Sequence, residues 1–149
     1  MIYPDDASVA AIGAGLLDSS LPKPGWTHAA HFAACLWLIR CRPDLPAATH
    51  LPGIIRAYNE ATGVANTATG GYHATITLAS IGMAEAHAAA CPGLGLAALV
   101  NGLLAGPCGD RDWLLAYWSA GRLFSVAARA GWVGPDLMAL PAEVKAFFF

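Results

Sequence analysis

Apolar residues along this chain recur with the three- to four-residue spacing of amphipathic helices rather than with the alternation of strands. Pro, Gly, Thr and Asp residues separate the apolar segments and supply start and stop signals for helices. The pattern therefore predicts an all-α fold. We expect a compact bundle of six or seven helices that forms a single domain over residues 1–149.

Several helix ends are recognisable in the sequence. Thr27 is a natural N-cap, and it places Trp26 and His31 at the two positions of a hydrophobic staple. Gly63 is a natural stop for the third helix, in which Arg56 and Glu60 are expected to pair at i,i+4. The expected helices run from Asp5 or Asp6 to about Ser20, Thr27 to Pro43, Pro46 or Pro52 to Gly63, about Gly71 to Ala90, Leu94 to Ala105, Asp110 or Asp112 through Trp118, and Arg122 to Ala130.

Charge and composition exclude two classes of partner. Eight basic against ten acidic residues give a net charge of −2, and no basic run is available to neutralise a phosphate backbone, so we expect no nucleic acid. The hydrophobic content of 56% includes much alanine, and Pro and Gly residues divide the best candidate membrane span, Ala86 to Gly109. We therefore expect no membrane insertion. Without a basic, apolar leader at its start, the chain is expected to be cytoplasmic.

The four cysteines lack C-x-x-C spacing and stand in apolar or Pro/Gly surroundings. This favours unpaired thiols over a disulfide framework or a zinc knuckle.

The last three residues are aromatic. Phe147–Phe149 would leave apolar area in water unless they dock on their own domain or on a second subunit. A homodimer is one arrangement that we expect on this ground, and an interaction subunit is one function.

Three of the five histidines stand at the openings of expected helices: His28, His31 and His73. His28 and His31 are i,i+3 neighbours on one helix, so both rings can reach one ion. With His73 they would form a three-histidine site for zinc, iron, manganese or nickel, with coordination positions left for water and substrate. Such a site predicts metal-dependent acid/base or hydrolytic chemistry on a small polar molecule.

Two other readings of the histidines remain open. Helix N-termini favour anions over cations, so the same residues could form a metal-free pocket for a small polar molecule or anion in a non-catalytic binding protein. The rings could also serve the fold by bonding to backbone groups. H-x-x-H alone is a weak metal pattern, because it lacks the spacing and the glutamate of H-E-x-x-H.

Other candidate site residues lie between and after the histidines. Glu60 is the only acidic residue between Asp44 and Glu85, so it is the candidate general base. Arg122 and Arg129 lie seven residues apart, on one face of the expected helix, and could hold a carboxylate or phosphate. The remaining candidates for substrate binding are polar or aromatic: Tyr58, Asn59, Asn66 and Tyr72.

The sequence contains three motifs: Trp26-Thr27-His28-Ala29-Ala30-His31, Tyr58-Asn59-Glu60 followed by Asn66-Thr67, and Gly71-Tyr72-His73. Together they resemble a family of small bacterial proteins that have an all-helical fold and no established activity. The resemblance implies that the three histidines converge. Relatives commonly carry Glu after the last histidine, where this chain has Ala74. If that Glu acts in the chemistry, this protein has lost the activity or uses Glu60 instead.

Overall fold

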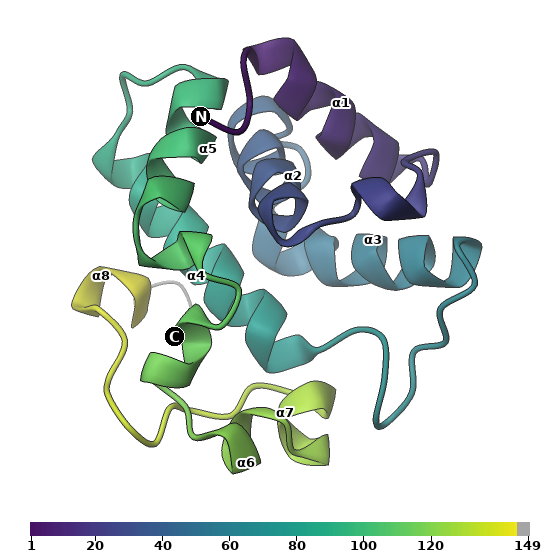
Figure 1. The fold of residues 1–149 in the computed structure, drawn as a ribbon, viewed down its shortest axis with the longest axis vertical. Coiled ribbons are helices and arrows are strands. Elements are labelled where there is room, and N and C mark those ends of the chain that lie inside the picture. The colour runs from purple at the N-terminus through teal and green to yellow at the C-terminus, as the bar shows by residue number, and fades with distance from the viewer. Residues whose placement is uncertain (146–149) are drawn as a thin grey trace.

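Helix α2 lies at the centre of the computed structural model, where four other long helices contact it (Figure 1). It is buried over most of its surface because apolar residues follow one another around it, and a helix apolar on all sides is stable only inside a core. Phe32, Leu36 and Leu38 are no more than 2% exposed. The long helices are α1 (Asp6–Leu17), α2 (His28–Cys41), α3 (Ala47–Ala61), α4 (Ala74–Ala90) and α5 (Leu96–Ala105).

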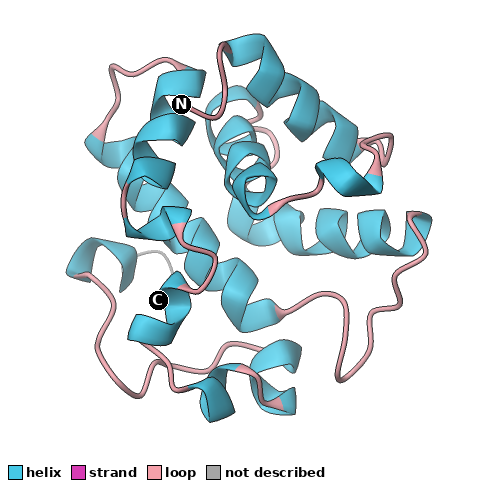
Figure 2. Ribbon diagram, viewed as in Figure 1, coloured by secondary structure: helices cyan, strands magenta, loops and turns pink. Residues whose placement is uncertain are grey.

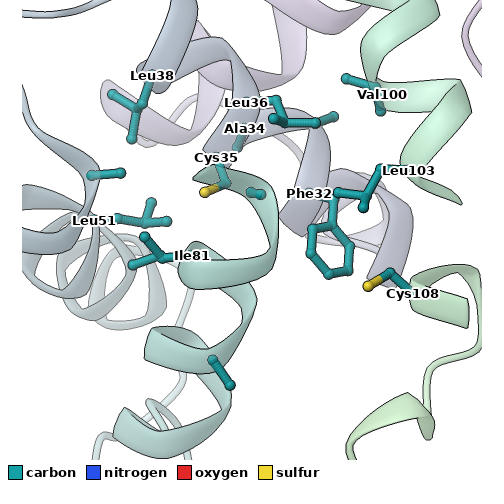
Figure 3. Close-up of a cluster of buried hydrophobic side chains, with 14 of the residues drawn as sticks. Phe32, Ala34, Cys35, Leu36, Leu38, Leu51, Ile81, Val100, Leu103 and Cys108 are labelled. Atoms are coloured by element: carbon teal, nitrogen blue, oxygen red, sulfur yellow. The ribbon is translucent and has the colours of Figure 1, made fainter. Parts of the chain in front are cut away.

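The core forms where α2 meets α3, α4 and α5. In the close-up of Figure 3, Phe32 and Leu36 from α2 face Val100 and Leu103 of α5, while Leu38 lies toward Leu51 of α3. Small residues allow the helices to approach closely. A side chain at Gly13 of α1, for instance, would collide with the ring of Trp37 on α2.

Short elements connect and follow the long helices. They are the 3-10 turns η1 (Lys23–Gly25), η2 (Pro107–Gly109) and η3 (Trp113–Ala116), and the short helices α6 (Ala120–Leu123), α7 (Val126–Ala130) and α8 (Ala142–Lys145). Two of them, α7 and α8, contact α4. The structure describes residues 1–145, so the expectation for Phe147–Phe149 lies outside the described residues. Figure 2 shows helices and loops, with no strand within the described part. The predicted all-α bundle is confirmed.

Capping interactions set the helix boundaries largely as predicted. Asp5 and Thr27 cap α1 and α2 through side-chain oxygens that accept the N–H groups of Ser8 and Ala30. Gly63, with φ of +84°, ends α3: its N–H and that of Val64 bond back to the last turn in a Schellman motif. Within residues 1–145, no helix is long and apolar enough to cross a membrane.

Two predicted helices after α5 were wrong. The segment from Asp112 to Trp118 forms the short turn η3 instead of a full α-helix, and Asp112 makes no side-chain cap there. The segment from Arg122 to Ala130 is divided between α6 and α7, because Ser125 begins a new helix by accepting the N–H of Ala128. The four cysteines are free thiols, as expected, and Cys35 and Cys108 are buried.

Candidate functional site

The first turn of α2 carries two of the three predicted site histidines. Thr27 caps this helix, so that Trp26 stands just before the cap and His31 one turn inside it. Their rings stack with centroids 3.7 Å apart and an interplanar angle of 25°. The predicted hydrophobic staple is therefore confirmed, with an imidazole as the inner partner.

The rings of His28 and His31 each bond to a backbone carbonyl. His28 Nε2 lies 2.7 Å from the oxygen of Cys108, and His31 Nδ1 lies 2.6 Å from the oxygen of Thr27. A carbonyl oxygen only accepts, so these two nitrogens carry the ring hydrogens. In the neutral rings, Nδ1 of His28 and Nε2 of His31 then remain as hydrogen-bond acceptors.

His73 has a different role, because it is the N-cap of α4. Its Nδ1 accepts the N–H of Ile76 at 3.1 Å, and its Nε2 donates to the oxygen of Leu123 at 2.8 Å. The residue is 7% exposed, and both ring nitrogens are engaged. This arrangement requires the neutral ring, since a protonated Nδ1 cannot accept a hydrogen bond.

The surroundings favour the neutral form of His31 and of His73. The pKa of His31 is lowered mainly because packed neighbours replace water around the ring, and in addition by the nearby His28, although an edge of the residue stays exposed. Burial likewise lowers the pKa of His73, and the positive charge of Arg129 adds to the effect.

A cleft of about 500 Å³ opens beside the start of α2, and we call it the histidine cleft. Both His28 and His31 line it, and aromatic rings supply much of the rest of its wall. Its lining residues are Trp26, Thr27, His28, His31, Phe32, Ile76, Ser80, Arg111, Trp113 and Leu114.

Arg111 supplies the positive charge of the histidine cleft. No described residue forms a hydrogen bond or ion pair with its guanidinium, and the only ion pair within residues 1–144 joins Arg42 to Asp44. Asp110 and Asp112 flank Arg111 in the sequence, but neither lines the cleft. Trp113 is 5% exposed, and its indole N–H is buried without a partner among the described residues.

A second cleft, of about 370 Å³, shares three wall residues with the first: Trp26, His31 and Ile76. We call it the loop cleft, because it borders the connection between α3 and α4. Its other lining residues are Ile55, Asn59, Val64, Gly71, Tyr72, His73, Thr77, Phe124 and Arg129.

Asn66 organises the loop beside this second cleft. Its side-chain oxygen accepts hydrogen bonds from the amide of Asn59 and from the backbone N–H of Tyr72, and its own amide donates to the oxygen of Arg56. Gly71 has φ of +77°, and a side chain there would collide with the oxygen of Ala65 and with Asn66. The Asn and the Gly of this motif are thus explained by the turn itself.

The structure brings some of the predicted site residues together and separates others. The loop cleft gathers Asn59, Tyr72, His73 and Arg129 around His31. Tyr58 is buried and donates its hydroxyl hydrogen to the oxygen of Leu21. Glu60 is exposed and lines neither cleft, and its predicted ion pair with Arg56 was wrong, because Arg56 lies over the ring of Tyr72, at 4.3 Å.

The predicted arginine pair on one helical face was also wrong, because α6 and α7 are separate helices. Arg122 donates through Nε to the oxygen of Gly134. Arg129 donates through Nη1 to the oxygens of Gly71 and Tyr72. Each guanidinium therefore holds a backbone segment, and only Arg129 lines the loop cleft.

The three histidines do not form a ready set of metal ligands. Among the residues that the structure describes, no group of three or more His, Cys, Asp or Glu side chains is placed to hold a metal ion. His73 has no free ring nitrogen, whereas His28 and His31 have one each. The three-histidine metal site therefore stays a prediction that needs a change at His73 or a further ligand.

Arg111, Trp113 and Phe124 line the clefts, although the sequence did not indicate them as site residues. Arg111 stands between two aspartates in the sequence, which is typical of a solvated surface segment. Ala74, which stands where relatives are expected to carry Glu, is the first residue of α4 and 5% exposed.

In comparisons with known proteins, no family model, curated protein or solved structure matches this chain.

Proposed function

We propose that the protein binds a small anionic molecule in the histidine cleft. The observation that carries this proposal is Arg111, a guanidinium that lines the cleft and has no partner among the described residues. The other arginines of residues 1–144 each bond to a carbonyl or a carboxylate or lie over an aromatic ring. An unpaired guanidinium offers a planar set of donors that suits carboxylate or phosphate oxygens.

The two histidines add hydrogen-bond acceptors beside the guanidinium. In the neutral rings, His28 and His31 each keep one nitrogen as an acceptor, so an anion that also carries a hydroxyl or an acidic hydrogen can make a further hydrogen bond there. Hydrogen phosphate and small hydroxy acids combine such a donor with anionic oxygens for Arg111. Either kind of ligand is compatible with acid/base chemistry, since a neutral imidazole can take up the proton that the ligand donates.

Thermal unfolding in the presence of hydrogen phosphate tests the proposal. A ligand that binds the folded state raises the melting temperature with its concentration. We expect this rise in the wild type, and we expect most of it to be lost in Arg111→Gln. Lys23→Gln is the matched control, because Lys23 is also exposed and without a side-chain partner but lines neither cleft. Equal stabilisation of the two variants would contradict the proposal.

Metal-dependent chemistry is the second candidate, and one observation favours it. His28 and His31 line the same cleft, and each has a ring nitrogen that no described residue uses. Zinc, iron, manganese and nickel all accept such nitrogens. Elemental analysis of protein purified without an affinity tag tests this candidate. Metal that disappears in His28→Ala and His31→Ala would support it, and metal content unchanged by both substitutions would remove it.

A further inference from the structure

The histidine cleft and the loop cleft are neighbours with a common wall. Trp26, His31 and Ile76 line both of them. Their volumes, about 500 and 370 Å³, each suit part of a small organic molecule. A ligand that extends past the shared residues from one cleft therefore enters the other.

Most polar groups of the loop cleft are already bonded within the protein. Both ring nitrogens of His73 are engaged, the amide of Asn59 donates to Asn66, and Arg129 donates to the carbonyls of Gly71 and Tyr72. Its apolar lining consists of Ile55, Val64, Ile76 and Phe124, with the ring of Trp26. The loop cleft thus offers contact area for a hydrocarbon or aromatic group.

Phe124 is the exposed member of this apolar lining. It is 60% exposed, at the end of α6, and no described residue stacks on its ring. When an apolar group covers an aromatic side chain that is exposed to water beside a cleft, the free energy of the system falls. Leu137 has the same exposed fraction, 60%, but lines neither cleft.

We propose that the ligand is an organic acid with an apolar tail, whose acidic group lies at Arg111 in the histidine cleft and whose tail lies against Phe124 in the loop cleft. This inference rests on the proposed function, because the acidic group uses the same guanidinium. The stacked pair of Trp26 and His31 lies between the two ends of such a ligand and contacts its middle.

Calorimetric titration with acetate and with octanoate tests the inference, because the two acids share a carboxylate and differ in their tails. We expect octanoate to bind the wild type more tightly by at least about tenfold, since several methylene groups leave water. Phe124→Ser should remove most of this preference and leave acetate binding unchanged. Leu137→Ser should preserve the preference, and Arg111→Gln should weaken the binding of both acids.

Other outcomes of these titrations would contradict separate parts of the inference. Equal affinity for the two acids, or equal effects of Phe124→Ser and Leu137→Ser on octanoate, would overturn the placement of the tail while leaving the anion site intact. Saturable octanoate binding that Arg111→Gln does not affect would overturn the placement of the acidic group. Failure of both acids to bind would overturn the inference, and a negative phosphate experiment as well would overturn the proposed function.

Discussion

His31 stacks on Trp26 with ring centroids 3.7 Å apart, and this pair, with Ile76, forms the wall that the two clefts share. The stack joins the residue before the cap of α2 to the first turn of the same helix. It therefore fixes both the entry of the chain into α2 and the position of one candidate ligand-binding ring.

A double-mutant cycle should detect this coupling. We expect Trp26→Ala and His31→Ala to be non-additive by about 1 kcal/mol in the free energy of unfolding, since stacked rings contribute energy beyond their buried area. Urea denaturation of the two single variants and the double variant measures the term. A parallel cycle of Trp26→Ala with His50→Ala should be additive, because no ring contact joins those residues. Additivity in both cycles would contradict the account of the staple.

The cap at His73 predicts a larger effect on stability. His73→Ala should lower the free energy of unfolding by about 1–3 kcal/mol, because the N–H of Ile76 and the carbonyl of Leu123 both lose a partner. His73→Asn should cost less, since Asn is among the best N-cap residues.

His50→Ala is the control for that measurement. His50 is half-buried, and no described residue bonds to its ring, so we expect a change within about 0.5 kcal/mol. A His73→Ala variant as stable as His50→Ala would show that the cap contributes nothing.

Acidification should destabilise the protein through the same ring. Because the pKa of His73 is lowered in the folded state, the unfolded chain binds more protons in the acid range. The contribution to stability is then complete above the unfolded pKa of about 6.5, and it is lost progressively as the pH falls below that value. His31, whose pKa is also lowered, adds to the loss with the same sign.

Denaturation curves recorded between about pH 7.5 and pH 5 check this dependence. We expect His73→Asn to show a shallower decline than the wild type, because Asn caps the helix without titrating. Parallel declines in the two proteins would assign the acid sensitivity to other groups.

The helices were predictable where local chemistry decides them. Thr27 and Asp5 are good N-caps, and Gly63 takes the positive φ that ends α3, so these boundaries follow from a few neighbouring residues. The division between α6 and α7 was missed because Ser125 can either continue a helix or cap a new one, and contacts distant in the sequence decide between the two. The Nε atom of Arg122, for example, bonds to the oxygen of Gly134.

The candidate site was predictable only in part. The spacing of Trp26 and His31 indicated their contact, because both lie on one helical turn. Neither the approach of Arg111 to α2 nor the contact of His73 with Leu123 has a local signal, since each joins segments some 50 or more residues apart in the chain. Composition alone therefore could not separate histidines that hold the fold from those that face a cleft.

The ring signals of the five histidines, followed by nuclear magnetic resonance during a titration with hydrogen phosphate, test the central claim most directly. We predict that the signals of His28 and His31 shift saturably while those of His50 and His87, which line neither cleft, stay in place. In Arg111→Gln, the same shifts should require at least about tenfold more phosphate, as expected for the loss of a charged hydrogen bond. Shifts that do not saturate, or that are equally strong in Arg111→Gln, would contradict an anion site in the histidine cleft.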